Sequence, residues 1–317
     1  MTPIRITLIH NPDAGNESQP SGAKLVKWIR SAGYKVDYQS AKEKKWQKIL
    51  RSPGDVVAVA GGDGTVGKVA RRLIDTSTPI AVLPMGTANN IASSLGMSGM
   101  TLKNLIAGWK NARCVHFDAA TARGPWGSRH FIEGFGLGLF AEAMFCLHNA
   151  KEDDLAHAKN PDHEIDLVLK ILKSRLQKIQ PRPLTVRLDG EDLSDKYVLL
   201  EALNIGFVGP NLNLAPQAST NDGLLDIVAV SYNRQDELKK YLTDRLRGSE
   251  SPLKLPRRRG RHLQIESDIF PVHIDDKGWP DGNKSVPIPS HAVSVRIDPG
   301  ALIFLLPKVA KTKVSTR

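Results

Sequence analysis

The first third of the chain alternates short apolar runs with amphipathic stretches. Apolar, β-branched runs that end in glycine or asparagine predict parallel strands, and apolar residues at helical spacing between them predict helices. The predicted strands cover residues 4–10, 35–40, 55–60 and 79–83, and the predicted helices cover 21–32, 46–50, 66–75 and 91–95. This alternation is typical of a parallel sheet that binds its ligands outside the carboxyl ends of the strands.

The pattern changes after about residue 110. Short strands separated by turns, with few helices, are predicted at 115–122, 130–138, 184–188, 196–205, 224–230, 261–265, 271–275 and 292–297. Such a series predicts an antiparallel sandwich or barrel. We therefore expect a three-layer α/β domain at 1–112 and an antiparallel β-sandwich domain at 113–298. A helical insertion near 150–180 interrupts the second domain, and the segment 299–317 carries a last apolar strand that returns to the first domain.

A glycine loop follows the third predicted strand, with the sequence Gly61-Gly62-Asp63-Gly64-Thr65. Glycine permits positive φ and lets a phosphate approach the backbone where a Cβ would obstruct it. Asp63 would stand at the carboxyl end of the strand, where it could orient a nucleotide directly or through Mg²⁺, and Thr65 could cap the next helix or bond a phosphate oxygen. The alternative is a tight strand-to-helix turn with Asp63 as its cap. We favour a phosphate site.

Composition agrees with an anionic ligand without choosing one. The 317 residues include 44 Lys and Arg against 33 Asp and Glu, a net charge of +11, which favours nucleotides, acidic lipids, an anionic membrane or nucleic acid. No nucleic-acid recognition motif supports the last of these. Two cysteines provide neither a disulfide framework nor a metal cluster, and no signal-peptide or membrane-spanning pattern occurs, so we expect a cytoplasmic protein.

A second loop, Pro84-Met85-Gly86-Thr87-Ala88-Asn89-Asn90, follows the next strand about twenty residues later. Together with the first loop and with Leu95-Gly96, it resembles the catalytic domain of the diacylglycerol kinase family, which includes bacterial lipid kinases and sphingosine and ceramide kinases. NAD kinases also carry the first motif, so the second is the more specific. The resemblance implies a first domain of the NAD kinase and diacylglycerol kinase type, and a β-rich second domain that holds the lipid.

The resemblance also assigns nucleotide contacts. Asn11 lies in Asn11-Pro12-Asp13-Ala14-Gly15, which resembles the family's first motif but by itself is an ordinary turn. Ser40 stands at a strand end where the family has a residue that contacts ATP. The remaining expected contacts with nucleotide and phosphates are Gly61, Gly62, Asp63, Gly64, Thr65, Lys68, Gly86, Thr87 and Asn89.

A third motif, between Pro216 and Asp226, resembles the segment in which the family binds a structural Mg²⁺. Carried over, Asp222 supplies the carboxylate, and Ser219 and Leu224 supply carbonyl oxygens. Hard oxygen ligands in a turn suit Mg²⁺. The alternative is a hairpin turn at Asn221-Asp222-Gly223, which explains two of these residues but not the surrounding match.

The catalytic carboxylate is expected at the end of strand 271–275. There the family has Asp-Gly-Glu, which takes the proton from the lipid hydroxyl, and matching the strand puts Asp275 on the Asp, Asp276 on the Gly and Lys277 on the Glu. A second departure follows the glycine loop, where Gly67 and Lys68 replace the family's usual Asn and Glu. Two carboxylates are thus replaced by Lys, so Lys68 neutralises phosphate charge in an active kinase, or the protein binds its ligands without turnover.

We expect an ATP-dependent lipid kinase that acts on diacylglycerol, a sphingoid base or a related alcohol, with Asp63 and Asp275 as catalytic residues and with Mg²⁺ and ATP bound. The alternatives are a catalytically impaired binding protein of the same fold and an NAD kinase. Peripheral contact with an anionic membrane is expected, through the basic helix 164–180 or the run 257–261, although both are equally explained as solvated surfaces. A homodimer is compatible with the resemblance.

Overall fold

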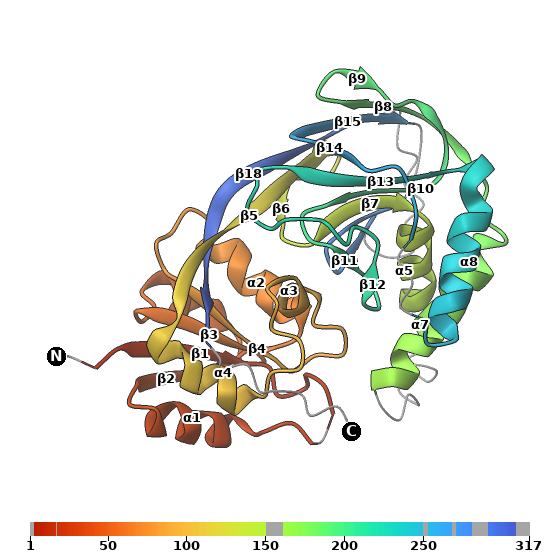
Figure 1. The fold of residues 1–317 in the computed structure, drawn as a ribbon. Coiled ribbons are helices and arrows are strands. Elements are labelled where there is room, and N and C mark those ends of the chain that lie inside the picture. Colours follow the sequence, from red (N-terminus) through yellow and green to blue (C-terminus); the bar gives the residue numbers. More distant parts are fainter. Residues whose placement is uncertain are drawn as a thin grey trace.

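The N-terminal lobe is built on a parallel sheet in the order β2-β1-β3-β4, at the lower left of Figure 1. The computed structural model describes residues 3–16, 18–149, 161–249, 253–267, 271–280 and 291–308. The strands of this lobe are β1 (Arg5–His10), β2 (Lys35–Ser40), β3 (Val56–Gly61) and β4 (Ile80–Pro84). Its helices are α1 (Gly22–Ser31), α2 (Asp63–Leu73), α3 (Asn90–Ser94) and α4 (Leu102–Gly108), with 3₁₀ turns η1 (Trp46–Arg51) and η2 (Trp109–Asn111).

Helix formation in this lobe follows the apolar spacing. On α1, Leu25 and Ile29 are fully buried, and the Ser21 hydroxyl caps the helix by accepting a hydrogen bond from the Lys24 N–H. On α2, Val66 and Val69 are buried in the same core. They lie about one turn apart on one face of the helix, as helical periodicity predicts. The expected helix 46–50 is a 3₁₀ segment instead, and α4 was not predicted.

The C-terminal lobe is dominated by antiparallel strands. They are β5 (Arg113–Gly124), β6 (Gly127–Phe131), β7 (Gly134–Gly138), β8 (Arg182–Leu188), β9 (Glu191–Asp192), β10 (Asp195–Leu203), β11 (Phe207–Val208), β12 (Leu212–Asn213), β13 (Leu225–Ser231), β14 (Arg258–Gly260), β15 (His262–Ser267), β16 (Val272–Ile274), β17 (Lys277–Trp279) and β18 (His291–Leu306). The helices are α5 (Leu139–Asn149), α7 (Pro161–Leu176), α8 (Gln235–Leu246) and the 3₁₀ turn η3 (Tyr232–Arg234). The expectation of an α/β lobe followed by an antiparallel β-sandwich-like lobe is confirmed.

Two apolar cores hold the C-terminal lobe together. One lies between its strands, and the other lies where α5, α7 and α8 pack on β10 and β13. The helices α5 and α8 were not predicted, and the expected strands 292–297 and 301–306 are one strand, β18. None of the described helices is long and apolar enough to cross a membrane.

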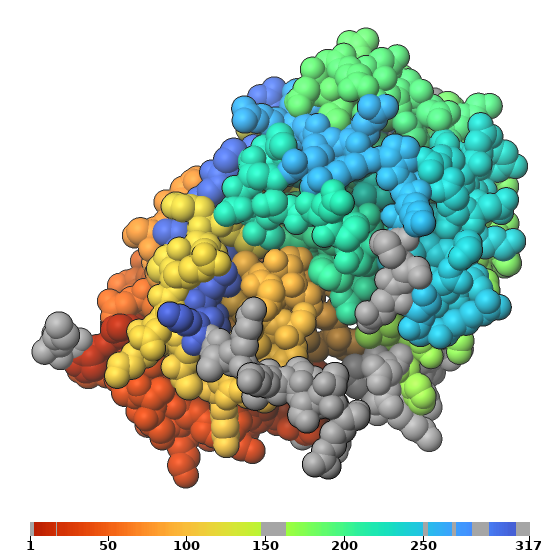
Figure 2. Space-filling view, viewed as in Figure 1, coloured from red at the N-terminus to blue at the C-terminus, as the bar shows by residue number. Residues whose placement is uncertain are grey.

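The long strands β5 and β18 run side by side from one lobe to the other (Figure 1). The first residues of β18 pair with β15. Near the last residues of β18, Phe304 pairs in parallel with Ile80 of β4. Within the described residues, β18 thereby joins the parallel and antiparallel strands into one sheet. Figure 2 shows the two lobes from the same side, red to yellow against green to blue.

The buried carboxylate of Asp118, on β5, ties the crossing to the C-terminal lobe. One oxygen accepts a hydrogen bond from the Gly223 N–H and the other from the Gly300 N–H, both at 2.7 Å, at a side chain that is 1% exposed. Two segments distant in sequence thus share one buried acceptor. Loss of this acceptor would leave both N–H groups without a protein partner, at a cost in free energy.

We predict that Asp118→Ala lowers the free energy of unfolding by about 2–4 kcal/mol, because two buried N–H groups lose their acceptor. The measurement is the urea-unfolding midpoint. Asp55→Ala, which removes one exposed bond to the Arg5 N–H, is the matched control and should cost about 0.5–1 kcal/mol. Equal losses in the two variants would contradict the structural role of Asp118.

Candidate active site

The two glycine loops touch each other at the carboxyl edge of the parallel sheet. A Cβ built on Gly86 would lie 2.5 Å from the Gly62 Cα, and a Cβ on Gly62 would lie 3.1 Å from the Gly86 Cα. Only glycine at both positions permits this approach. The loops that follow β3 and β4 therefore form one continuous backbone surface.

Asp63 joins the two loops by capping α3. Its Oδ2 accepts a hydrogen bond from the Asn90 N–H at 2.8 Å and its Oδ1 accepts one from the Ile91 N–H at 3.0 Å. Burial raises the pKa of Asp63, and these amides oppose the rise. The capping geometry envisaged as the alternative is therefore present, but on α3 rather than on α2, and Asp63 also lines the cavity described below.

The second loop uses its side chains partly on itself. Asn89, at φ +54°, accepts a hydrogen bond from the Gly86 N–H and donates one to the Gly86 carbonyl, so its amide holds the loop shape. Thr87 faces the cavity and donates a hydrogen bond of 2.8 Å to Glu164 of α7, in the other lobe. The loop thereby contacts both lobes.

Asp275 lies in the turn between β16 and β17, across the site from the two glycine loops. Its Oδ1 accepts hydrogen bonds from the Ile132, Glu133 and Gly134 N–H groups at 2.8–3.3 Å, and its Oδ2 lies 2.5 Å from Arg71 Nη1. The side chain is only 3% exposed. Burial raises the pKa of Asp275 although Arg71 and the amides favour its charged form.

The Arg71–Asp275 pair depends on the glycine at position 67. A Cβ on Gly67 would lie 3.1 Å from Arg71 Nη1 and 3.8 Å from Asp275 Oδ2. The space that a side chain would take is filled by the guanidinium, which crosses from α2 to the other lobe. Lys68 points elsewhere: it is exposed and does not line the cavity, and Lys277 is likewise exposed and outside the lining.

Glu133 and Asn90 also line the cavity, and neither was named as a site residue from the sequence. Asn90 Nδ2 donates to Glu133 Oε2 at 3.2 Å and to the Gly209 carbonyl at 3.1 Å, while its buried Oδ1 has no hydrogen-bond partner among the described residues. Burial raises the pKa of Glu133 well above its usual value, and the Asp63 and Asp275 carboxylates raise it further. Asn90 belongs to the second loop motif but was given no role there, and Glu133 lies within a predicted strand that carried no site motif.

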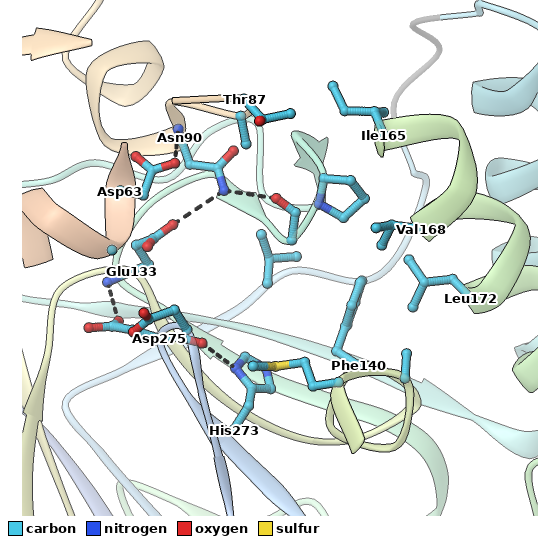
Figure 3. A pocket seen from close by; sticks show the side chains of 18 of the residues that line it. Asp63, Thr87, Asn90, Glu133, Phe140, Ile165, Val168, Leu172, His273 and Asp275 are labelled. Carbon is cyan, nitrogen blue, oxygen red and sulfur yellow. Dashed lines mark hydrogen bonds between the residues drawn. The ribbon is translucent and has the colours of Figure 1, made fainter. Parts of the chain in front are cut away.

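These groups surround a cavity of about 450 Å³ that Figure 3 shows from close by. Its polar end is lined by Asp63, Gly64, Thr87, Ala88, Asn90, Glu133, Glu164, His273, Asp275 and Asp276. Its apolar end is lined by Phe140, Ala143, Met144, Ile165, Val168, Leu172, Val208 and Pro210, with Gly209 between the two. Five of the described lining residues are acidic and none is Lys or Arg, so a polyanion can enter only with compensating cations.

The donor chemistry of the polar end suits Mg²⁺, which prefers hard oxygen ligands. Asp63 and the unpartnered Asn90 Oδ1 are the residues that would hold it. Among the described residues no group of three or more acidic, His or Cys side chains is arranged to hold a metal by itself. The fit is therefore to an ion that keeps water or phosphate ligands, as Mg²⁺ commonly does.

A buried pair, His273 and Glu201, supports the floor of the cavity. His273 Nε2 lies 2.8 Å from Glu201 Oε2, and its Nδ1 lies 3.2 Å from the Asp275 carbonyl, so Nδ1 carries a proton that it donates. Burial raises the pKa of Glu201; burial also opposes the charged form of His273, but Glu201 raises the pKa of His273 overall. The imidazole is thereby fixed against the backbone of the Asp275 turn.

The other predicted nucleotide contacts lie along the same sheet edge but outside the cavity lining. Asn11 follows β1 and its N–H donates to the Ala60 carbonyl of β3, and Ser40 ends β2 opposite His10. Gly61 packs on Thr65, which is buried. All the predicted strand-end residues therefore lie along this edge of the sheet. Of the predicted nucleotide contacts, only Asp63, Gly64 and Thr87 line the cavity.

In the turn expected to hold a structural Mg²⁺, the positive charge beside Asp222 comes from an arginine side chain. Asp222 contacts the Arg259 guanidinium, and its other oxygen accepts a hydrogen bond from the Leu224 N–H at 3.1 Å. Arg259 also approaches Asp226, which pairs with Arg257 at 2.6 Å. In this arrangement the residues of the turn do not fit a resident divalent cation. The same contacts occupy much of the basic run 257–261.

We predict that a chelator leaves the Tm of the wild-type protein unchanged within about 1 °C, because Arg259 neutralises Asp222. Arg259→Ala should lower the Tm by about 2 °C and make it respond to added Mg²⁺. Thermal melts with and without Mg²⁺ test this. Arg258→Ala, which removes an exposed pair with Glu191, is the control and should show no response. A marked loss of wild-type Tm on chelation would contradict the assignment.

Glu133 should make the stability depend on pH. Because burial raises its pKa above 4.5 in the folded state, the unfolded chain ionises first, so its contribution to stability falls as pH rises from about 4.5 through the folded pKa. We predict that the Tm difference between Glu133→Gln and wild type becomes more positive from about pH 5 to about pH 8. The exposed Glu266→Gln should show a constant difference. A difference that stays constant for Glu133→Gln would contradict the prediction.

Comparison with known proteins matches both lobes. Residues 5–122 match the model of the diacylglycerol kinase catalytic domain, and residues 153–306 match the YegS C-terminal NAD kinase beta sandwich-like domain. A diacylglycerol kinase of Bacillus subtilis is 24% identical over 253 residues, which cover 77% of this chain and 79% of that protein.

Solved structures share the fold across both lobes. The crystal structure of a diacylglycerol kinase from Bacillus anthracis has a TM-score of 0.69 at 19% identity and covers 97% of this chain and 98% of its own. Yeast NADH kinase is more distant, with a TM-score of 0.52 at 12% identity over 98% of this chain and 85% of its own. The first part of the chain therefore matches the diacylglycerol kinase catalytic domain, and the second part matches the YegS C-terminal domain.

Proposed function

We propose that this protein is an ATP-dependent lipid kinase that transfers the γ-phosphate of ATP to the hydroxyl of diacylglycerol, a sphingoid base or a related long-chain alcohol. The family supports a kinase with an alcohol acceptor. The observation that carries the proposal is the single cavity in which the glycine loop and acidic groups lie at one end and apolar side chains at the other. A polar head with an alkyl tail fits both ends.

The nucleotide would bind with its phosphates against the first glycine loop. Gly64 lies in the first turn of α2, where the N–H groups of a helix have no intrahelical partner and attract anions. Asp63 and Thr87 line the same end of the cavity. Phosphoryl transfer needs mainly positioning and charge neutralisation. Mg²⁺ bound with ATP would supply the positive charge that this acidic end lacks.

The lipid would enter along the apolar end. Phe140 of α5 faces Ile165, Val168 and Leu172 of α7 across this part of the cavity (Figure 3), which Met144 of α5 also lines. Burying an alkyl chain there would contribute roughly 0.8 kcal/mol per CH₂ group. Lys170 of α7 and Lys178 just beyond its end are exposed, so we place the peripheral contact with an anionic membrane on this segment rather than on the paired arginines of the run 257–261.

Two alternatives remain to be separated from this proposal. An NAD kinase would use a soluble acceptor, and the likeness to yeast NADH kinase supports the shared fold alone. A binding protein without turnover is motivated by Lys68 and Lys277 in place of two glutamates. Because neither lysine lines the cavity, the proposal gives them no part in the transfer.

We predict label transfer from γ-labelled ATP to a lipid in a thin-layer assay with Mg²⁺. Diacylglycerol, a sphingoid base and a long-chain alcohol are offered as acceptors in mixed anionic vesicles, and NAD is offered in solution. Label on NAD alone would favour the NAD kinase, and bound nucleotide with no transfer to any acceptor would favour the protein without turnover.

Asp63→Asn should lower transfer to lipid on the order of 10²-fold or more, because a neutral amide cannot supply the negative charge that would hold Mg²⁺ at the phosphate end. Asp236→Asn, at an exposed position on α8, is the matched control and should keep wild-type activity. Melting curves of both variants report whether the cap on α3 survives. Full activity of a folded Asp63→Asn protein would remove Asp63 from the mechanism.

A further inference from the structure

A kinase with an alcohol acceptor needs a group that can receive the proton of the attacking hydroxyl. Five acidic side chains line the described part of the cavity: Asp63, Glu133, Glu164, Asp275 and Asp276. A base must have a free lone pair within reach of the substrate. The hydrogen bonds that each carboxylate already accepts therefore decide between them.

Four of the five carboxylates are engaged by protein donors. Asp63 accepts the N–H groups of α3, Glu133 accepts the Asn90 amide, and Glu164 accepts the Thr87 hydroxyl. Glu133 is also half-buried, and burial together with the neighbouring carboxylates raises its pKa well above the usual value. Protein donors thus already hold all three of these carboxylates.

Asp275 is the most fully engaged of the four. Three backbone N–H groups and the Arg71 guanidinium share its two oxygens, and the side chain is 3% exposed. An ionised carboxylate offers about four lone-pair sites. Protonation by a substrate would break part of this set. Asp275, which we expected from the sequence to act as base, therefore connects the two lobes through Arg71.

Asp276, the next residue, has the opposite character. Its side chain is 35% exposed, no described residue donates a hydrogen bond to it, and the nearest cation, Lys277 Nζ, is 4.0 Å away. It faces the glycine loop, since a Cβ built on Gly64 would lie 2.9 Å from Asp276 Oδ2. The carboxylate therefore reaches across the cleft to the place proposed for the phosphates.

We infer that Asp276, and not Asp275, is the catalytic base that accepts the proton of the lipid hydroxyl, while Asp275 is a positioning residue that holds the turn. The inference rests on the proposed function. The acceptor oxygen forms a bond to the γ-phosphorus as the bond from that phosphorus to the β–γ bridging oxygen breaks. ADP leaves with the bonding electrons, the hydroxyl proton passes to Asp276, and the exposed carboxylate returns it to water.

The test compares neighbouring carboxylates in the full chain. Asp276→Asn should lower kcat for lipid phosphorylation on the order of 10²-fold or more, with KM for ATP within about threefold of wild type and an unchanged Tm. Asp276→Glu should recover about a tenth of the wild-type rate. Asp275→Asn should instead lower the Tm by several degrees, because its amide nitrogen meets donors.

Asp236→Asn is again the control for the Asp-to-Asn exchange itself. An Asp276→Asn protein that keeps more than about a third of wild-type kcat would overturn the inference while leaving the proposed kinase in place. If that variant does not fold, Asp276→Ser is measured in its place under the same criterion. A wild-type protein that phosphorylates no lipid would overturn the proposed function, and the inference with it.

Discussion

The buried contact between Arg71 and Asp275 is the constraint on which the site depends. It joins α2 of the N-terminal lobe to the β16–β17 turn of the C-terminal lobe, at a carboxylate almost without exposure. Removing either partner of such a pair leaves an uncompensated charge, which costs far more than the pair contributes. Three backbone N–H groups from the β6–β7 connection add to it. The glycine loop and the opposite turn are therefore held at a fixed spacing.

The acidity of the cavity follows from this arrangement and opposes stability. Burial disfavours the charged forms of Asp63 and Glu133, and the Asp275 carboxylate raises the pKa of both. A site that concentrates like charges is destabilising until a ligand brings compensating cations. A nucleotide that arrives with Mg²⁺ would supply them, and by mass action it would stabilise the folded protein.

Much of the fold could be predicted from the sequence because the local signals agree with the final structure. Apolar runs ending in Gly61 or Pro84 are strands, and their loops meet because parallel strands share one carboxyl edge. Helix α8 was missed although Leu238, Tyr241 and Leu242 mark one helical face. Helix α5 was missed because it is apolar on most sides, so no single face stands out.

The site was only partly predictable from the sequence. Tertiary packing decides which of several neighbouring residues take part in it. The motif places two adjacent carboxylates in the β16–β17 turn, but only the structure distinguishes the buried, hydrogen-bonded Asp275 from the more exposed Asp276. Glu133 and Asn90 gain their roles from residues more than forty positions away. Arg259 reaches Asp222 from a strand that no local motif links to that turn.

The most direct test of the account is a crystal structure with a non-hydrolysable ATP analogue and Mg²⁺. The account predicts the terminal phosphate between Gly64 and Asp276, with Asp275 still bound to Arg71 and the alkyl cavity open behind it. A nucleotide bound outside the two glycine loops, or a terminal phosphate that Asp276 cannot reach, would contradict it.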